Sequence, residues 1–391
     1  MRKVLAILLA LAMLAAGVDS AAAESTESKA TLLCLNIGKA DCLLLSYENT
    51  HWLIDAGYEQ NWGALKTALS QYDVDRLDGV FLTHCHKDHY GGLMLLAQSD
   101  VSVDAWYASS VWFDVKEGQH PAVLAAASHG EEVSWLSAGD VIPAGSGASF
   151  TVLGPLEVNE ENENNNSLVL FFSSPAGSIL LCGDMKIEEE MDLVDAGSLT
   201  ACTLLKTGHH GDNKTLSDSF LAKVRPEAAV ISTSTAEEPD TPAPSTLRKL
   251  KDIGCAVYVT QECRDALLIT LSGGKVTGAD DIIWDGVPVR IEGVTLESDC
   301  EADTVTLRNT SGAPVSLDGY TLLSTKGTKS LRLSGLTLEP GGQWVIGGRK
   351  TTVTVDQTWD EKNVWSNKKR DVGILYDPWG RPVCCADNGL D

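Results

Sequence analysis

The chain has 391 residues, with 54 acidic and 30 basic side chains and a formal net charge of −24. A chain of this length has more residues than one ordinary hydrophobic core organises, which favours two domains. The charge opposes tight, non-specific binding to a long polyanion such as DNA, so a phosphate-bearing substrate would have to be captured locally.

Residues 1–23 predict a cleaved signal peptide. Arg2 and Lys3 precede an apolar run that ends near Ala16, and the alanines at 21–23 fit a small-residue cleavage site. The run is shorter than the roughly 20 apolar residues that span a membrane, and no later stretch of the sequence reaches that length. We therefore expect a secreted, extracellular protein that starts at about Glu24 and has no membrane span.

Residues 31–277 predict an α/β domain, because short apolar runs typical of strands alternate with helical patterns. Strands are expected at residues 32–38, 42–47, 51–57, 79–83, 150–154, 167–173, 177–183, 202–208, 228–232 and 255–260, and helices at 62–72 and 93–98. Two polar stretches interrupt them: an asparagine-rich run at 157–167 and a proline-rich run at 237–244. By composition, both predict solvated loops.

Beyond Trp284 the helical pattern stops. Valine, threonine and leucine alternate with polar residues between glycine and proline turns, which predicts a small β-sandwich. We therefore expect the first domain to occupy residues 24–285 and the sandwich to occupy residues 286–391.

The ten cysteines do not define a disulfide framework. Five of them lie in or beside apolar runs, where they behave as small hydrophobic residues: Cys34, Cys42, Cys182, Cys202 and Cys255. Two bridges remain open from the sequence: Cys255 with Cys263, and Cys300 with either Cys384 or Cys385.

Residues 83–92 read THCHKDHYGG and crowd three histidines and an aspartate into six positions. In extended backbone, His84 and His86 project to the same side and can share one metal ion. Asp88 and His89 then fall at the start of a helix, near a second position. Imidazole and carboxylate are ligands that zinc and similar cations prefer. A single histidine is usually a surface or core residue, but burying four such groups without a cation would cost about 1–3 kcal/mol for each unpaired group.

Two further segments carry side chains of the same type. Asp184 follows the strand expected at 177–183, and His209 and His210 follow the strand expected at 202–208. Strand ends are where α/β folds gather functional groups, so we expect the three segments to meet at one site. Asp184 alone would be an ordinary turn residue.

The succession HxHxDH, GD and HHG, each after a strand, resembles the metallo-β-lactamase superfamily. The segments LNIGKADCLLL, HWLIDAG, FLTHCHKDHYGGL, NNNSLVLFF, LLCGDM and TGHHGD are most similar to the hydrolase domain of ComEC-type competence proteins. This resemblance covers residues 31–272. It implies an αββα sandwich with a site for two divalent metal ions, zinc or manganese, at one edge of the paired sheets.

The resemblance also implies roles for individual residues. The metal ligands would be His84 and His86 for the first metal, Asp88, His89 and His210 for the second, and Asp184 as the bridge between them. His210 is favoured over His209 as the ligand, although the choice stays open. Asp88, His209 and Asn165 are the expected catalytic residues, with His209 facing the substrate. Asp55 would support the histidine loop, and Asp41 matches an acidic residue near the site; ordinary turn chemistry is the alternative for both.

Three features depart from the family pattern. Many members supply a further histidine to the first metal, whereas this chain has asparagines at 164–166, as the ComEC-like branch does. The first metal is therefore expected to be labile, and Asn165 is a candidate substrate or metal contact. ComEC-like chains read GQGDS and HHGS where this chain reads GKADC and HHGD, so Asp212 would weaken phosphate binding. The channel-forming segments of that family have no counterpart in this sequence, so DNA uptake is not implied.

The sequence beyond about Val287 resembles a lamin-tail domain, which implies an immunoglobulin-like sandwich. Such a domain would bind a cell surface, nucleic acid or protein. The basic run from Lys368 to Arg370 is a candidate contact for a polyanion, with an ordinary solvated loop as the alternative.

Together these features predict a secreted metallohydrolase. Its expected reaction is metal-assisted hydrolysis of a phosphodiester, with extracellular nucleic acid or a nucleotide as the substrate. One alternative is an esterase that acts on cell-surface phosphodiesters such as phosphorylcholine. Another is a catalytically inert binding module, which the intact set of candidate ligands argues against. The motif details disfavour β-lactam hydrolysis.

Overall fold

The structure is a computed structural model that describes residues 28–326 and 329–390. The predicted signal peptide, residues 1–23, lies outside this range. In the part of the chain that the structure describes, no helix has the length and apolar character needed to cross a membrane.

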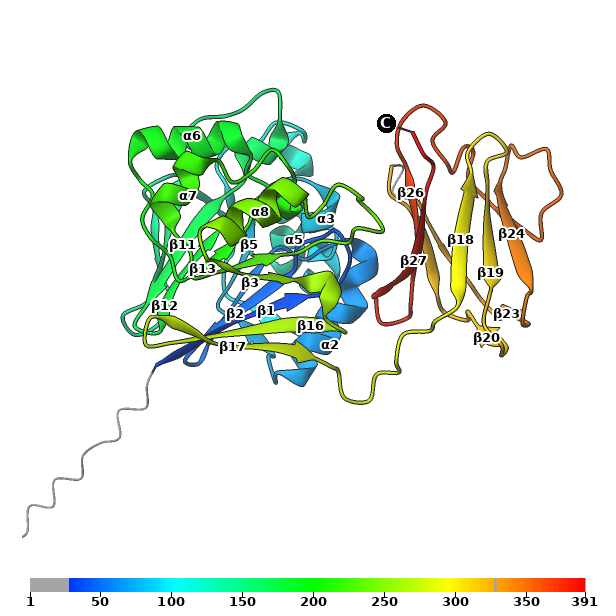
Figure 1. The fold of residues 1–391 in the computed structure, drawn as a ribbon, viewed down its shortest axis with the longest axis horizontal. Coiled ribbons are helices and arrows are strands. Elements are labelled where there is room, and N and C mark those ends of the chain that lie inside the picture. The colour runs from blue at the N-terminus through cyan, green and yellow to red at the C-terminus, as the bar shows by residue number, and fades with distance from the viewer. Residues whose placement is uncertain (1–27, 327–328, 391) are drawn as a thin grey trace, which may run out of the picture.

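Two mixed β-sheets form the centre of the N-terminal unit (Figure 1). The eight-stranded sheet has the order β17-β16-β1-β2-β3-β5-β7-β8, and the seven-stranded sheet has the order β15-β14-β13-β12-β11-β10-β9. The strands of the first sheet are β1 (Lys29–Leu35), β2 (Leu43–Tyr47), β3 (Thr50–Ile54), β5 (Gly79–Leu82), β7 (Trp106–Ser109), β8 (Val133–Leu136), β16 (Ala266–Ser272) and β17 (Lys275–Ile282). Those of the second are β9 (Val141–Pro143), β10 (Ser149–Gly154), β11 (Val169–Ser174), β12 (Gly177–Leu181), β13 (Leu204–Lys206), β14 (Ala228–Ile231) and β15 (Ala256–Val259).

Helices cover the outer faces of both sheets. The helices are α2 (Trp62–Gln71), α3 (Lys87–Tyr90), α4 (Leu93–Ala97), α5 (Pro121–His129), α6 (Ile187–Ala196), α7 (Asp218–Val224) and α8 (Pro244–Asp252). One core lies between the sheets, a second under α2, α4 and α5, and a third under α6, α7 and α8. The αββα sandwich expected from the resemblance is therefore confirmed.

The helix α2 shows how the sequence produces this layering. Ala64, Leu65, Ala68 and Leu69 are buried, and their spacing places them on one face of a helix with a period of 3.6 residues. Short β4 (Arg76–Leu77) and β6 (Ser102–Val103) form a separate parallel pair near this layer.

Two four-stranded sheets form the C-terminal part, with the orders β18-β19-β24-β25 and β22-β21-β26-β27 and a shared apolar core. The bounds are β18 (Val294–Asp299), β19 (Thr304–Asn309), β20 (Val315–Ser316), β21 (Thr321–Ser324), β22 (Lys329–Arg332), β23 (Thr337–Leu338), β24 (Gln343–Gly348), β25 (Gln357–Trp359), β26 (Val372–Tyr376) and β27 (Pro382–Asp387). The predicted all-β sandwich is confirmed. Its relation to lamin-tail domains stays a prediction.

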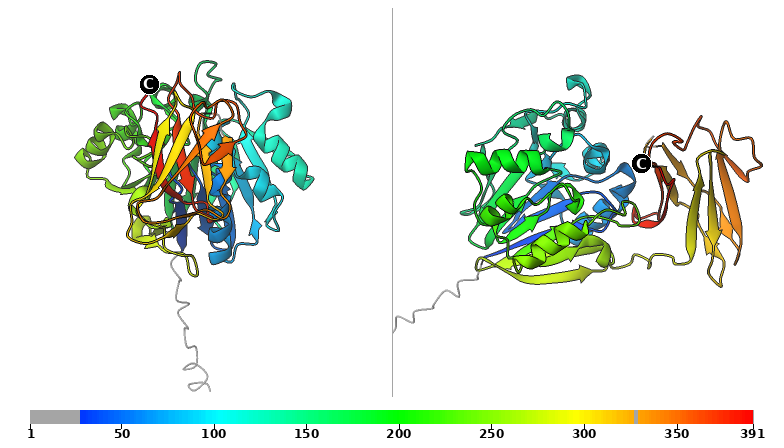
Figure 2. Two further views of the ribbon diagram at one scale, coloured as in Figure 1. Left: turned by 90° about the vertical axis from the view of Figure 1, so that its right-hand side faces the viewer. Right: turned by 45° about the horizontal axis from the view of Figure 1, so that its top comes forward.

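The sandwich is docked on the N-terminal unit through the sheet that contains β26 and β27 (Figure 2). Strand β26 is buried on both faces: Leu375 belongs to the sandwich core, and Ile374 and Tyr376 pack with Tyr58 of the N-terminal unit. A buried ion pair joins Arg381 Nη1 to Asp265 Oδ1 at 2.6 Å across the same interface. The two units are therefore in direct apolar and ionic contact.

All ten cysteines are free thiols. None of the bridges left open by the sequence is formed, including those of Cys300 with Cys384 or Cys385. Six of the ten are buried, and the rest are intermediate in exposure. Here the cysteines act as small apolar residues.

Candidate metal centre

The THCHKDHYGG motif lies between β5 and α4, and its residues 87–90 form the short helix α3. The sequence predicted this position after a strand, with Asp88 and His89 at the start of a helix. Asp55 fixes this loop: its Oδ1 accepts the backbone N–H of Thr83 at 2.8 Å, and its Oδ2 accepts the Thr83 hydroxyl at 2.8 Å. The backbone N–H of Ala56 also donates to the carbonyl of His89 at 2.7 Å. Asp55 adopts a left-handed conformation with φ of +59°, which is uncommon for a residue other than glycine and is held here by these contacts.

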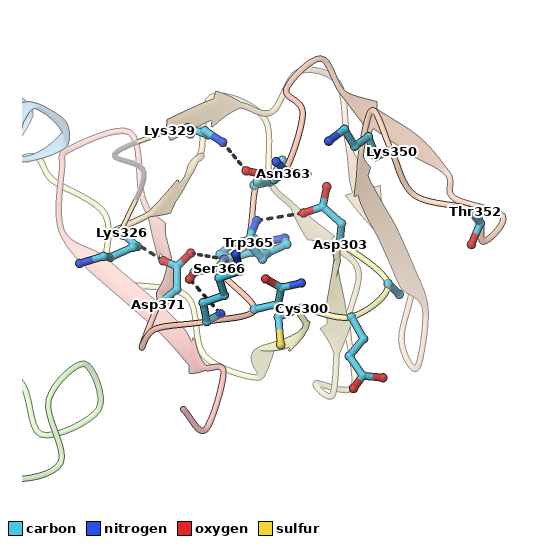
Figure 3. Close-up of a pocket in the computed structure, with 15 residues that line it drawn as sticks. Cys300, Asp303, Lys326, Lys329, Lys350, Thr352, Asn363, Trp365, Ser366 and Asp371 are labelled. Carbon is cyan, nitrogen blue, oxygen red and sulfur yellow. Dashed lines mark hydrogen bonds between the residues drawn. The ribbon is translucent and has the colours of Figure 1, made fainter. Parts of the chain in front are cut away.

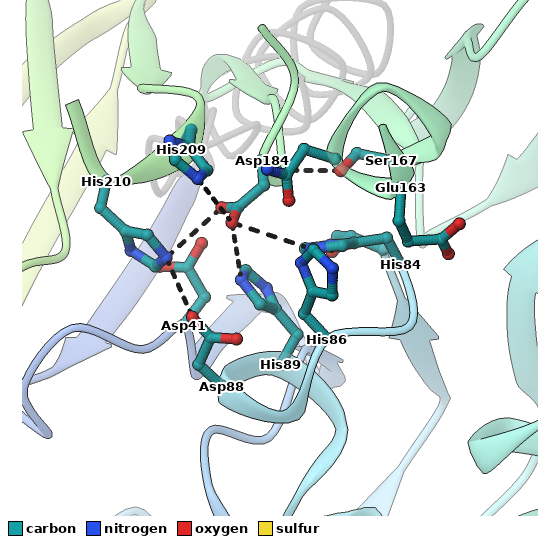
Figure 4. A network of polar contacts seen from close by, with 12 residues as sticks. Asp41, His84, His86, Asp88, His89, Glu163, Ser167, Asp184, His209 and His210 are labelled. Carbon is teal, nitrogen blue, oxygen red and sulfur yellow. Dashed lines mark hydrogen bonds and ion pairs between the residues drawn. The ribbon is translucent and has the colours of Figure 1, made fainter. Parts of the chain in front are cut away.

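Asp184 lies at the centre of the histidines that the sequence singled out (Figure 4). On one side, Asp184 Oδ2 lies 3.3 Å from His89 Nε2, and Asp184 Oδ1 lies 3.5 Å from His210 Nε2. His210 Nε2 is also 3.5 Å from Asp88 Oδ2. These four residues form a group whose ligand atoms lie within 4.8 Å of one another, and we call it the inner group.

A second group forms on the other side of the same carboxylate. His84 Nε2 lies 3.7 Å from Asp184 Oδ2 and 3.0 Å from His86 Nδ1. Asp184, His84 and His86 again fall within 4.8 Å of one another, and we call them the outer group. Asp184 is the one residue that these two groups share. Its role as a bridge between two metals stays a prediction.

Hydrogen bonds to the opposite ring nitrogens orient three of the imidazoles. His89 Nδ1 lies 2.7 Å from Asp55 Oδ2, and His210 Nδ1 donates to the carbonyl of Ser232 at 2.9 Å. His84 Nδ1 lies 3.1 Å from the hydroxyl of Thr83. Each ring therefore presents Nε2 to the centre, as metal-bound histidines with a supporting partner do.

Three polar atoms at the centre make no hydrogen bond to another described residue. They are His89 Nε2, His210 Nε2 and Asp184 Oδ1, and all three are buried. Such atoms would each cost about 1–3 kcal/mol in a folded protein without a compensating partner. Imidazole nitrogens and carboxylate oxygens at these separations are the donor set of divalent cations. The cluster thus fits divalent metal ions.

Electrostatics favour the ligand forms of two key residues. Burial alone would raise the pKa of Asp184, but His210, His89 and His209 hold it well below its usual range. Burial, reinforced by His89, lowers the pKa of His84 well below that of a free imidazole. Asp184 is therefore a carboxylate and His84 a neutral ring at neutral pH, which are the forms that bind cations.

The two adjacent histidines after β13 have different surroundings. His210 is completely buried and belongs to the inner group. The side chain of His209 is 18% exposed, and its Nε2 lies 3.9 Å from Asp184 Oδ2. Its Nδ1 lies 2.7 Å from Asp212 Oδ2. The structure thus places His210 with the ligands and His209 on the open side, and gives Asp212 an orienting contact that the sequence did not suggest.

Asn165 lies on a short 3₁₀ helix, η3 (Glu163–Asn166), with its side chain buried. Its Oδ1 accepts the backbone N–H of Lys186 at 3.0 Å, and its Nδ2 donates to Glu188 at 3.2 Å. These contacts hold the segment that follows Asp184. A direct contact of Asn165 with substrate stays a prediction.

Only the first part of the asparagine-rich run is the solvated loop that its composition predicted: residues 157–162 are exposed or intermediate in exposure. Residues 163–166 are instead all buried. Glu163 accepts the backbone N–H of Cys85 at 3.2 Å and that of Phe113 at 2.7 Å. Residues 163–166 therefore pack behind the histidine loop, and composition missed this because the polar groups of Glu163 are satisfied by partners distant in sequence.

Asp41 lies behind the inner group and pairs with a buried lysine. Lys206 Nζ lies 2.8 Å from Asp41 Oδ2, and both side chains are almost fully buried. Asp41, Asp55 and His89 also lie within 4.8 Å of one another. Lys206 was missed from sequence, although a lysine inside the apolar run LLKTG was a visible signal.

Lys39, which the sequence analysis noted only as part of GKADC, lies at the edge of the inner group. Its Nζ is 3.4 Å from Asp88 Oδ2, and its side chain is 18% exposed. Its backbone N–H donates to Glu237 Oε2 at 3.1 Å. Burial alone would raise the pKa of Asp88, but Lys39 is the main influence that holds it well below its usual range.

A separate hollow of about 520 Å³ lies in the sandwich (Figure 3). Lys326, Lys329, Lys350 and Lys368 line it together with acidic residues, of which Asp371 accepts hydrogen bonds from Ser324 and from the backbone of Lys326. Arg370, the last residue of the predicted polyanion contact, instead pairs with Glu238 and Asp387. The hollow shares no residue with the metal centre.

Comparison with known proteins identifies the family. Residues 35–235 match the model of the metallo-beta-lactamase superfamily. The chain belongs to the metallo-β-lactamase superfamily.

The curated relatives of this metallo-β-lactamase-fold chain support the ComEC-like branch. The chain is 28% identical to ComE operon protein 3 of Bacillus subtilis over 42% of its own length and 21% of the relative. It is 28% identical to competence protein ComA of Neisseria gonorrhoeae over 68% of its own length and 36% of the relative. The chain therefore spans only about a fifth to a third of these relatives.

A solved structure with a similar fold is CmlA, a diiron β-hydroxylase from Streptomyces venezuelae. The match has a TM-score of 0.44 and 14% identity, and covers 60% of this chain and 53% of that one.

Proposed function

We propose that this metallo-β-lactamase-fold hydrolase is a two-metal phosphodiesterase that acts on nucleic acid or on nucleotides. The observation that supports this most is the position of Asp184 between two groups of buried ligands. Two cations about 3.5–4 Å apart suit in-line displacement at phosphorus, because they can contact both the attacking and the leaving oxygen.

Each of the two cations would have its own set of ligands. The outer group would hold one cation through His84 and His86, and the inner group would hold the other through Asp88, His89 and His210. Bound there, the cations would supply positive charge and an activated water at neutral pH. Zinc and manganese both accept these donors.

His209 is suited to move a proton at the open side of the centre. Asp212 occupies its Nδ1, which leaves Nε2 to exchange a proton or a hydrogen bond with substrate. Burial lowers the pKa of His209 below its ordinary value, so the ring is neutral at neutral pH. The partly exposed ammonium group of Lys39 adds positive charge beside Asp88 where a phosphate would bind.

The names of the relatives favour nucleic acid as the substrate class. One relative, from Neisseria gonorrhoeae, is named competence protein ComA, and another, from Haemophilus influenzae, is named recombination protein 2. Recombination is a process of DNA. A cell-surface phosphodiester such as phosphorylcholine is the competing substrate class.

A substrate panel tests the proposal. Purified protein with added Mn²⁺ or Zn²⁺ should hydrolyse bis-p-nitrophenyl phosphate, and should cleave single- or double-stranded DNA or dinucleotides better than p-nitrophenyl phosphorylcholine. If the protein bound no metal and was inactive on the whole panel, the result would support the alternative of a catalytically inert binding module. Activity on the choline ester alone would replace nucleic acid by cell-surface phosphodiesters.

We also propose that the protein is exported. The basic, apolar and small-residue succession in residues 1–23 supports this. Expression of the full chain in a secreting host should yield mature protein in the medium with an N-terminus near Glu24. An intact N-terminus on protein retained in the cells would contradict it.

A further inference from the structure

Exposed aromatic side chains gather beside the outer group. Trp112 and Phe113 follow β7, and Trp135 lies on β8, the edge strand of the eight-stranded sheet. The rings of Trp112 and Trp135 are stacked, with centroids 4.7 Å apart and an interplanar angle of 23°. His120 packs edge-on against both. We call Trp112, Phe113 and Trp135 the aromatic shelf.

The exposure of this shelf is unusual for the molecule. Phe113 is 51% exposed and Trp135 is 38% exposed, and they are the two aromatic residues among the exposed large hydrophobic residues of residues 28–326 and 329–390. Packing of Trp112 on Trp135 explains the burial of His120, but it does not explain why Phe113 is left in water. Exposed aromatic rings next to a polar site commonly contribute to ligand binding, because they offer a large apolar area with a defined stacking geometry.

The shelf is fixed to the metal centre by hydrogen bonds. Glu163 is buried, and it accepts the backbone N–H of Cys85 from the histidine loop and that of Phe113 from the shelf. The next residue, Asp114, places its Oδ2 3.3 Å from His86 Nε2. One buried carboxylate therefore holds the shelf and the outer group in a fixed relation.

Charge limits how this protein can hold a nucleic acid. With a net charge of −24, the molecule is poorly suited to the broad basic surface with which many proteins bind phosphates. Stacking of bases on aromatic rings is an alternative source of affinity that does not depend on sequence. A base linked to a phosphate at the outer group would lie where the shelf is exposed.

We infer that the aromatic shelf is a stacking subsite for a nucleobase of the substrate, with Phe113 as its principal contact. This inference rests on the proposed phosphodiesterase function and deepens it, because it names the part of the substrate that supplies affinity. A quaternary ammonium group, which aromatic faces also bind, is the competing ligand at the same surface.

Substitution of Phe113 tests the subsite. Phe113→Ala should raise KM for a dinucleotide about 5- to 150-fold, the range that the loss of one base–aromatic stack produces, with kcat largely retained. Phe113→Tyr and Phe113→Trp should keep the parental KM, since both rings can stack. Ile253→Ala, which shortens a 47% exposed apolar side chain outside the shelf, is the matched control and should have no effect.

Binding without turnover separates this inference from the proposed function. In the metal-loaded parent, a dinucleotide analogue whose bridging ester oxygen is replaced by a methylene group should quench tryptophan fluorescence without being hydrolysed, and Phe113→Ala should weaken that binding by the same factor. If the parent hydrolyses the dinucleotide and Phe113→Ala leaves KM and quenching unchanged, the subsite is wrong while the function stands. If the parent is inactive and the analogue does not quench, both fail. A KM increase for p-nitrophenyl phosphorylcholine alone would reassign the shelf to choline.

Discussion

The inner and outer groups share Asp184 but are built differently. In the inner group, His89 and His210 are fully buried, and each is fixed by a partner on its second ring nitrogen. In the outer group, the side chain of His86 is 35% exposed, and its partner Asp114 is 47% exposed. The inner position is held rigidly, and the outer one faces solvent.

This difference implies that the two metals have different affinities. Ligands that are oriented before binding lose little conformational freedom, whereas an exposed histidine must be ordered by the metal itself. The outer group also offers two histidines, with a buried asparagine run where many family members supply a third. We therefore expect a tight inner site and a labile outer site.

Asp184→Asn should have the largest effect, because it removes the carboxylate shared by both groups. We expect no detectable phosphodiesterase turnover and metal content below one ion per chain, with the fold retained. Activity assays, elemental analysis and circular dichroism check this. Asp218→Asn, at a carboxylate that is 91% exposed, is the control and should behave as the parent. Substantial turnover in Asp184→Asn would refute the assignment of the centre.

His86→Ala should separate the two sites. One tightly bound metal should remain, and turnover should fall about 100- to 1,000-fold, comparable to the loss of one charge-stabilising group. Brief dialysis of the parent against a weak chelator should likewise remove one metal first. If His86→Ala lost both metals, or if the parent lost both metals at the same time, the inner and outer groups would not be independent metal sites.

Asp55→Asn should weaken the inner site more than the outer one. This carboxylate orients His89 and the histidine loop, and removing such a partner typically costs about 10- to 100-fold in metal affinity or activity. Competition with a metal-binding dye measures the affinity. If the affinity for the weakly bound metal falls and that for the tightly bound metal does not, the inner group is the weak site and the outer group the tight one.

Lys39→Gln introduces the residue usual in the ComEC-like branch. The loss of an ammonium group next to Asp88 should raise KM for an anionic phosphodiester by several-fold, since a partly exposed charge contributes about 1 kcal/mol or less. Metal content should not change. Steady-state kinetics beside elemental analysis test both parts, and an unchanged KM would remove Lys39 from substrate binding.

Glu189→Gln should alter stability alone. Burial raises the pKa of Glu189 to about 8, so the folded state keeps a proton that the unfolded chain releases near its ordinary pKa. The free energy of unfolding should therefore fall as the pH rises from about 4.5 to about 8. In Glu189→Gln, the free energy of unfolding measured with urea should depend less on pH over this range. The metal content should not change. A steeper dependence on pH in the variant would contradict a protonated Glu189 in the folded parent.

The sequence was sufficient for features encoded by local spacing. The His84–His89 motif, its position after a strand and at the start of a helix, and the α/β class all follow from residues adjacent in the chain. The αββα layering was expected only from the family resemblance. Strand and helix periodicity also located α2, α4 and most of the N-terminal strands.

Features that depend on partners distant in the chain were not predictable. Lys206 meets Asp41, and Glu163 joins the histidine loop to Phe113, only after two sheets have packed together. The sequence shows that a polar side chain can form hydrogen bonds, but it does not show which backbone N–H groups will be its partners. For the same reason, β26 could be recognised as a strand region but not as one buried on both faces.

The buried Arg381 side chain has a consequence for how the molecule denatures. It contacts Asp265 of the N-terminal unit and Asp377 of the sandwich, and both carboxylates are almost fully buried. Separating the units would strand at least one of these charges in apolar surroundings, which is strongly unfavourable. The halves should therefore melt in a single calorimetric transition, and cutting the link at residues 283–293 should leave them associated as a nicked but intact particle.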